Sequence, residues 1–188
     1  MSREVNSPAE GPVLTADQQE AWLAYMRVSL RLSYEMNRQL QSDSGLSLPD
    51  YDVLNALADT AGERLPASGL AARIGWERSR LSHHLQRMSA RGLVERCACE
   101  TDRRATDAVL TDTGRAALVA ATPGHAALVR RMFFDGLDGS QVPALRAALE
   151  AIHEQVLRHG TLPPPEFQHR LPGLTADAAP HVSGPAGG

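Results

Sequence analysis

The sequence predicts a mainly α-helical protein with one small β-hairpin, and three observations support that prediction. Apolar residues recur at helical spacing through most of residues 15–159. Only around residues 93–110 does the pattern become strand-like. Of the 188 residues, 43% are hydrophobic and 22% are charged, which is ordinary for a globular domain and excludes wholesale disorder. The length suits one domain with short extensions.

Several classes of protein are disfavoured by the same composition. No apolar run approaches the ~18–20 residues that span a bilayer, so we expect no membrane partner. Residues 1–6 contain no apolar signal region, which favours a cytoplasmic protein. The two cysteines, Cys97 and Cys99, are too close together to form a stabilising disulfide framework.

The first helix is predicted to begin at Thr15, because Thr15 and Gln18 have the spacing of a capping box. It should run to about Ser42, with Gly45 as the stop signal. Its apolar residues lie on more than one face, so we expect it to pack in more than one direction. A second helix should begin after Ser47 and end near residue 59, followed by a turn over 60–64.

Two further helices are predicted over residues 67–74 and 77–91, with Gly75 as the turn between them and Gly92 as the stop. Ala71 lies four residues before Gly75, where a small side chain lets the helices meet. The shared core is predicted to comprise Leu70, Ile74, Leu81, Leu85 and Met88.

Residues 93–97 and 105–110 are predicted to form a hairpin with a basic tip. Thr111 should cap a helix over 112–136 that bends or breaks near residues 120–124, because Pro123 lies inside it. We expect His125 to cap the restarted helix, although it could also line a cavity. Ser140 should cap a last helix to about residue 159, whose inner face is Val142, Leu145, Leu149, Ile152 and Val156.

These elements divide the chain into regions with different expected roles. We expect a flexible arm and a disordered tail at the two ends, a helical dimerisation region made of two separate segments, and a DNA-binding region between them. The respective ranges are 1–14 for the arm, 160–188 for the tail, 15–46 with 112–159 for dimerisation, and 47–111 for DNA binding.

The order of a short helix, a glycine turn, a longer helix and a hairpin is that of a winged helix-turn-helix. The outer face of the longer helix carries hydroxyl, amide and guanidinium groups and no acid, which suits a reader of the DNA major groove. The charge distribution agrees: residues 63–104 have a net charge of +4 although the whole chain has −3. The alternative is an ordinary solvated helix face.

The sequence resembles the MarR family of bacterial transcriptional regulators. The resemblance covers about residues 21–156 and depends on an ordered set of motifs. They are Gly45-Leu46-Ser47-Leu48-Pro49-Asp50-Tyr51-Asp52-Val53-Leu54, Leu70-Ala71-Ala72-Arg73-Ile74-Gly75-Trp76, Ser79-Arg80-Leu81-Ser82-His83-His84-Leu85, Arg91-Gly92-Leu93-Val94-Glu95-Arg96, Asp102-Arg103-Arg104-Ala105 and Leu110-Thr111-Asp112-Thr113-Gly114.

The resemblance implies a homodimeric transcriptional regulator, expected to be a repressor, with its terminal helices interlocked and two winged modules on a palindromic operator. In a family-like wing, Arg103 or Arg104 enters the minor groove and Asp102 orients an arginine. The predicted contacts to double-stranded DNA are Arg78, Ser79, Arg80, Ser82, His83, Gln86, Arg87, Arg103 and Arg104.

The resemblance also implies a pocket for a small aromatic effector that releases DNA. Its predicted border is Trp22, Met26, Tyr51 and Trp76, near Arg27 and Arg31, which could meet an anionic group. Each of these aromatic residues could instead be part of a filled core. The alternative function is a constitutive winged-helix DNA-binding protein, or a protein-interaction adaptor, without ligand sensing.

We expect neither an enzyme nor a cofactor or metal site, because no phosphate-binding loop, nucleophile elbow or zinc-binding helix motif is present. His83 and His84 diverge by about 100° on a helix and do not make a metal pair. Cys97 and Cys99 could face the same side of a strand, and Arg96 could lower a thiol pKa. We interpret them as ordinary wing residues.

Overall fold

The computed structural model describes residues 13–98 and 106–165. The chain forms two compact units, residues 1–35 and residues 36–188. Helix α1 (Ala16–Ser44) crosses the boundary between them. At its start, the Thr15 N–H donates to the Gln18 side-chain oxygen (2.9 Å) and the Gln18 N–H donates to the Thr15 hydroxyl (3.2 Å), so the predicted capping box is confirmed.

Apolar side chains of the N-terminal unit are largely exposed. Trp22 and Tyr25 are 54% and 53% exposed, and their rings lie 5.4 Å apart. Met26 is half-buried. In the whole of α1 only Leu40, which belongs to the second unit, is buried. The first 20 residues of this long helix therefore carry apolar surface that the single chain does not cover.

Helix α2 (Leu48–Ala58) begins after Ser47, as the sequence predicts, and its start is a second capping box. The Asp50 N–H donates to the Ser47 hydroxyl (3.1 Å), and the Ser47 N–H donates to the Asp50 carboxylate (2.9 Å). Helix α2 supplies the centre of the core. A 3-10 turn, η1 (Ala61–Glu63), follows where a turn was expected.

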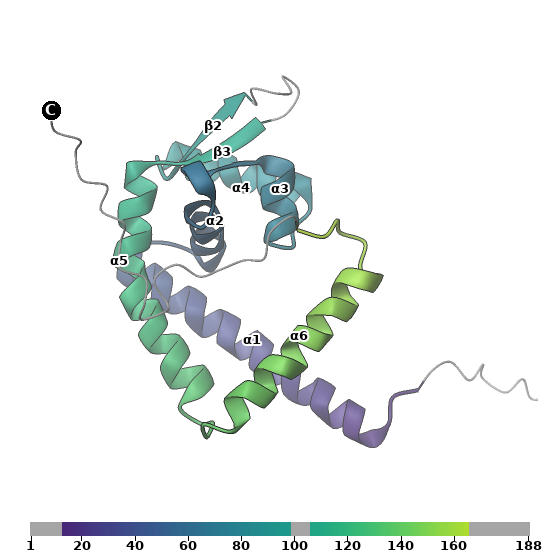
Figure 1. The fold of residues 1–188 in the computed structure, drawn as a ribbon. Coiled ribbons are helices and arrows are strands. Elements are labelled where there is room, and N and C mark those ends of the chain that lie inside the picture. Colours follow the sequence, from purple (N-terminus) through teal and green to yellow (C-terminus); the bar gives the residue numbers. More distant parts are fainter. Residues whose placement is uncertain (1–12, 99–105, 166–188) are drawn as a thin grey trace, which may run out of the picture. The chain divides into compact units, whose positions relative to one another are not determined.

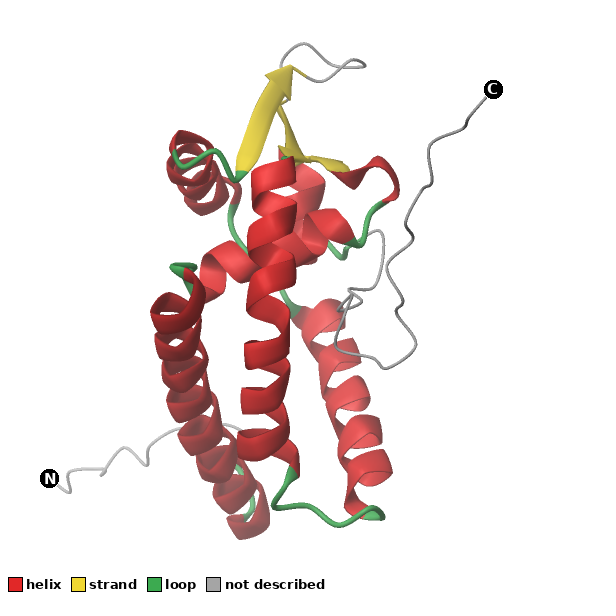
Figure 2. Ribbon diagram, turned by 90° about the vertical axis from the view of Figure 1, so that its left-hand side faces the viewer, coloured by secondary structure: helices red, strands yellow, loops and turns green. Residues whose placement is uncertain are grey.

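The sheet has three antiparallel strands in the order β1-β3-β2, where the sequence predicted only a two-stranded hairpin. Strands β2 (Val94–Ala98) and β3 (Thr106–Leu110) are that hairpin, and they project from the helices of this unit (Figure 2). The missed strand, β1 (Arg64–Pro66), pairs with β3 from Arg64 against Val109 to Pro66 against Asp107. Its three residues are too few to show a period of two.

The helix-turn-helix consists of α3 (Ala67–Arg73) and α4 (Arg78–Ala90), with α2 beside them (Figure 1). Gly75 between the two helices has φ +69°, a conformation that favours glycine. Ala71 is buried, as expected for the residue where the helices meet. The predicted core is confirmed: Leu70, Leu81, Leu85 and Met88 are fully buried, and Ile74 packs against them.

Helix α5 (Asp112–Val129) begins at the predicted cap, where the Gly114 N–H donates to the Thr111 hydroxyl (2.9 Å). Of the bend or break predicted near Pro123, the break is absent: the helix is continuous, and its ribbon bends along its length (Figure 1). Proline leaves the Val119 carbonyl without a donor, but Pro123 and Val119 are both exposed, so that carbonyl can bind water. A short π-helix, η2 (Arg130–Phe134), continues α5.

Helix α6 (Gln141–His159) spans the predicted range, but Ser140 does not cap it. Ser140 has helical backbone angles, and the cap is Asp138, whose carboxylate accepts from the Ser140 N–H (2.8 Å) and the Gln141 N–H (3.2 Å). No residue of α6 is buried. Among the described residues, no helix is both long and apolar enough to cross a membrane.

Candidate nucleic-acid interface

Helix α4 has a buried side and a polar side, and the polar side contains no acid. Leu81, Leu85 and Met88 fix the helix in the core, and His84 is also buried. All seven α4 residues that the sequence predicts as DNA contacts are exposed together: Arg78, Ser79, Arg80, Ser82, His83, Gln86 and Arg87. This face can donate hydrogen bonds and place positive charge against phosphates.

Ion pairs, one of them buried, fix the helices that present this face. The Arg73 guanidinium, 5% exposed, pairs with the Asp59 carboxylate and donates to the Thr60 hydroxyl (2.9 Å), which ties α3 to the end of α2. The Arg91 guanidinium, just after α4, donates to the Asp50 carboxylate and the Gly45 carbonyl, both at 2.7 Å. The partners lie 13 to 46 residues apart. No local sequence signal could have found them.

The wing is fixed by a charged pair inside the sheet. The Arg64 Nε donates to the buried Asp107 carboxylate at 2.7 Å, and the two residues join β1 to β3. The predicted wing-tip contacts Arg103 and Arg104, together with Asp102 and Cys99, lie outside the described residues. The structure therefore supports the base of the wing and does not place its tip.

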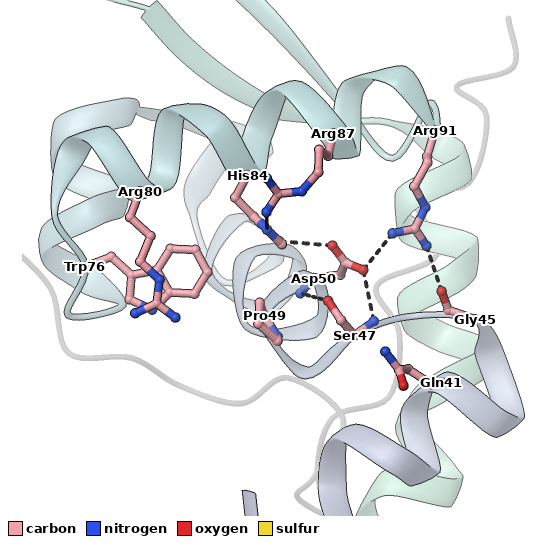
Figure 3. A pocket seen from close by; sticks show the side chains of 10 residues that line it. All are labelled: Gln41, Gly45, Ser47, Pro49, Asp50, Trp76, Arg80, His84, Arg87 and Arg91. Atoms are coloured by element: carbon pink, nitrogen blue, oxygen red, sulfur yellow. Dashed lines mark hydrogen bonds and ion pairs between the residues drawn. The ribbon is translucent and has the colours of Figure 1, made fainter. Parts of the chain in front are cut away.

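A polar hollow of about 380 Å³ opens beside α4, between that helix, the end of α1 and the start of α2 (Figure 3). Arginine side chains from α4 and the residue after it surround it: Arg80, Arg87 and Arg91. Trp76 forms one wall, and the Arg80 guanidinium lies 4.0 Å from the centre of its ring. Sequence reasoning did not predict this hollow.

Asp50 is the only acid among the residues that line the hollow, and its charge is already satisfied. Burial raises the pKa of Asp50, but hydrogen bonds from His84, the Ser47 N–H and Arg91 outweigh burial, so this pKa lies well below its usual value. The His84 Nε2 lies 3.0 Å from the Asp50 carboxylate, and the His84 Nδ1 lies 3.0 Å from the Arg87 guanidinium. Asp50 is therefore a carboxylate held in place by three residues, His84, Ser47 and Arg91.

The residues predicted to border an effector pocket lie in different environments. Tyr51 is buried in the core, 4.5 Å from the His125 ring and 3.5 Å from the Thr122 hydroxyl. Trp76 is half-buried and lines the polar hollow. Trp22 and Met26 belong to the N-terminal unit, as do Arg27 and Arg31. The aromatic residues of the second unit thus border a basic hollow or fill the core.

One expectation about a single residue is wrong, and one alternative is not supported. His125 does not cap a helix: it is buried in the middle of α5 against Tyr51, and burial lowers its pKa. The Cys97 pKa is raised, first by burial and then by Glu95, and it is Arg64, not Arg96, that opposes the rise. A thiol with a raised pKa is less reactive, which agrees with an ordinary wing residue. The described residues contain no cluster suited to a metal ion.

A helix-turn-helix with a three-stranded wing and a basic, acid-free second helix defines a DNA-binding protein of the winged-helix class. The sequence profile of the MarR family matches residues 44–105. The chain is similar to AbsC, a MarR family transcriptional regulator from Streptomyces coelicolor, with 37% identity over 78% of this chain and 98% of AbsC, at a TM-score of 0.72. The chain belongs to the MarR family.

A second relative was solved with nucleic acid. Sco3205, a MarR family transcriptional regulator from Streptomyces coelicolor in complex with DNA, is 35% identical over 81% of this chain and 99% of Sco3205, at a TM-score of 0.76. CouR from Rhodococcus jostii RHA1, bound to p-coumaroyl-CoA, is 25% identical over 74% of this chain and 95% of CouR, at a TM-score of 0.63. No curated protein matches the sequence. The chain is thus a DNA-binding transcriptional regulator and not an enzyme.

Proposed function

We propose that this chain is a homodimeric repressor that reads a palindromic operator with the exposed face of α4. The observation that carries the proposal is the exposure of seven polar and cationic side chains on one acid-free helix face, above a fully buried core. Arg80 and Gln86 are the residues expected to read base edges, by bidentate hydrogen bonds to guanine and adenine. Arg103 and Arg104 of the wing are expected to contact the minor groove or phosphates.

The dimer is supported by apolar surface that a single chain leaves uncovered. On α6, Ile152 and Val156 are 59% and 60% exposed, and Val142 and Leu149 are also exposed. On α1, Leu30 and Tyr34 are 67% and 64% exposed. Isolated amphipathic helices are marginal in water, so a second copy of this chain is the occupant we infer for these faces.

A small aromatic effector that releases DNA is the further part of this proposal. CouR holds p-coumaroyl-CoA, which shows that a relative of this fold accepts an organic ligand. By linkage, an effector that weakens DNA binding tenfold must itself bind the DNA-bound form about 1.4 kcal/mol more weakly. A protein that bound its operator equally with and without every candidate compound would fit the constitutive alternative.

The test is operator selection from a random DNA library, followed by binding measurements on wing variants. Arg103→Ala and Arg104→Ala remove charges near phosphates or the minor groove, so at least one should weaken binding and reduce the salt slope by ~1. Arg96→Ala, an exposed arginine of β2, is the matched control. If neither wing variant changes affinity or slope, the hairpin does not touch DNA. Failure to select any DNA would overturn the proposed function.

A further inference from the structure

Ion pairs on two neighbouring residues attach the short outer strand of the wing to the rest of the unit. The Glu63 carboxylate, at the end of η1, forms a bidentate pair with the Arg115 guanidinium near the start of α5. The next residue, Arg64, begins β1 and donates from its Nε to the buried Asp107 carboxylate of β3 at 2.7 Å. Because β1 has only three residues of strand pairing, these side chains add to its attachment.

The Arg64 side chain connects all three strands of the sheet. Besides its bond to Asp107, its Nη2 donates to the carbonyl of Ala98, the last residue of β2, at 3.4 Å. In the strand order β1-β3-β2, this guanidinium therefore reaches across β3 to the far strand. Ala98 pairs with Thr106, and residues 99–105 connect the two. One arginine thus holds both strands at the end where the wing tip begins.

The backbone before Arg64 has an unusual conformation. Among the described residues, Glu63 is the one non-glycine residue with a positive φ, +52°. L-residues rarely adopt this conformation, and it persists where the surrounding contacts impose it. The bidentate pair joins the Glu63 side chain to Arg115 of α5. The position of Arg64, one residue further on, therefore depends on α5.

We propose that a clamp formed by these two ion pairs positions the wing for DNA binding without itself contacting DNA. The clamp consists of Glu63, Arg64, Asp107 and Arg115, and it fixes the base of the hairpin relative to α5. Each pair is neutral overall, so the clamp contributes orientation and not charge. This inference rests on the proposed function, in which the wing tip contacts DNA. A hairpin that is already fixed loses less conformational entropy when it binds.

The loss of an acid from the clamp should have the opposite effect to the loss of another acid. DNA is polyanionic, so removing a nearby carboxylate ordinarily leaves binding unchanged or strengthens it. Glu63→Gln and Asp107→Asn each raise the net charge by one but break one pair of the clamp. Each should weaken operator binding about threefold to tenfold and reduce the salt slope, because the tip loses phosphate contacts. Arg115→Gln breaks the same pair as Glu63→Gln and should have a similar effect.

The first experiment measures operator affinity by fluorescence anisotropy over a series of salt concentrations. Glu95→Gln removes an exposed acid of β2 outside the clamp, and this control should bind as tightly as wild type or more tightly. Arg130→Gln, an exposed arginine just after α5, is the control for Arg115→Gln and should change affinity less than about twofold. Unchanged or stronger operator binding in both Glu63→Gln and Asp107→Asn would overturn the clamp.

The second experiment tests whether the clamp acts through the wing tip. Glu63→Gln is combined with Arg103→Ala and Arg104→Ala, which remove the charges of the tip. Residues that act through one another are not additive, so Glu63→Gln should change the affinity of the tip variant less than about twofold. An undiminished effect of Glu63→Gln in that background would overturn the proposed route from the clamp to DNA.

The third experiment needs no DNA and measures hydrogen exchange in the free full chain. Backbone amides of β2 and β3 should exchange about tenfold faster in Glu63→Gln and Asp107→Asn than in wild type, because the hairpin opens locally. Amides of α2 should keep their wild-type rates, which shows that the variants remain folded. Unchanged rates in the strands would overturn the clamp. Faster exchange in a protein whose wild type selects no DNA would overturn the proposed function and leave the clamp intact.

Discussion

The winged part of the molecule, from α2 to β3, and the terminal helices, α1 and α6, differ in how they bury apolar surface. In α2, seven of 11 residues are buried, and Leu54, Leu57 and Val53 have no exposed surface. In α6, none of 19 residues is buried, although the helix has apolar residues at helical spacing. The residues of α1 in the N-terminal unit resemble α6 in this respect.

The difference indicates what each region needs in order to be stable. Burial of apolar area provides most of the stability of a fold, so the winged part contains its own source of stability. The terminal helices expose theirs, and in the proposed function a second copy of the chain covers it. The free energy of unfolding of the winged part should therefore change with core substitutions and pH at any protein concentration. The stability of the terminal helices should instead depend on protein concentration.

The largest expected effect is that of Leu54→Ala in the winged core. Truncating a fully buried leucine leaves a cavity and should lower the free energy of unfolding by about 2–5 kcal/mol. Chemical denaturation at two protein concentrations measures it. The matched variant is Leu149→Ala on α6, 42% exposed in the single chain, whose smaller effect should decrease on dilution. If both variants lose the same free energy of unfolding at both protein concentrations, the two regions do not differ in this way.

The next largest effect is expected from Ile152→Glu, which should disrupt the dimer. A carboxylate on the apolar face of α6 must be desolvated in the interface twice, once for each copy, so the dimer dissociation constant should increase at least tenfold. Sedimentation at micromolar concentration measures it. His153→Glu places the same charge one position along the helix and should leave the dimer intact. A wild-type monomer at this concentration would contradict the role of α6.

A smaller, pH-dependent effect is expected from Asp52→Asn in the winged part. Burial raises the pKa of Asp52 to about 6, against 3.8 for an unperturbed aspartate. The folded state then holds a proton that the unfolded chain releases, so wild-type stability falls as pH rises from about 4 to 6. Asparagine stays neutral, and the variant should be about 2–3 kcal/mol more stable at pH 7 and nearly equal at pH 4. A stability difference that does not vary between pH 4 and 7 would contradict this assignment.

The smallest expected effect is that of truncation after His159. Of the removed segment, the structure describes residues 160–165, which lie beyond α6 and are not among the buried core residues. The shortened chain should still sediment as a dimer. Its operator affinity should stay within about twofold of that of the full chain. Weaker dimerisation or weaker DNA binding would give the segment 160–188 a role that the proposed function does not contain.

Local signals in the sequence predicted much of this fold. The capping box at Thr15, the helix start at Ser47, the glycine turn at Gly75 and the apolar spacing of α4 each depend on residues within a few positions of one another. These features determine backbone conformation directly, so they can be recognised before any tertiary contact is known. The exposed α4 face follows from the same spacing.

The structural features that sequence reasoning did not predict depend on contacts between distant residues. Strand β1 exists because Arg64 pairs with Val109, 45 positions further along the chain. Asp138 caps α6 in place of Ser140 because the turn gives its carboxylate the better approach to the N–H groups. The hollow beside α4 needs Asp50 and Arg91 to meet, and neither residue's neighbours indicate that they do.

The central claim is that the exposed face of α4 reads DNA, and the most direct measurement is the operator preference of Gln86→Ala. Affinities for the selected operator and for unrelated DNA should be compared with wild type at one salt concentration. The account predicts a loss of ~1–3 kcal/mol for the operator and little change for unrelated DNA, because an amide reads a base and carries no charge. An unchanged ratio of the two affinities would contradict the assignment of α4 as the reading helix.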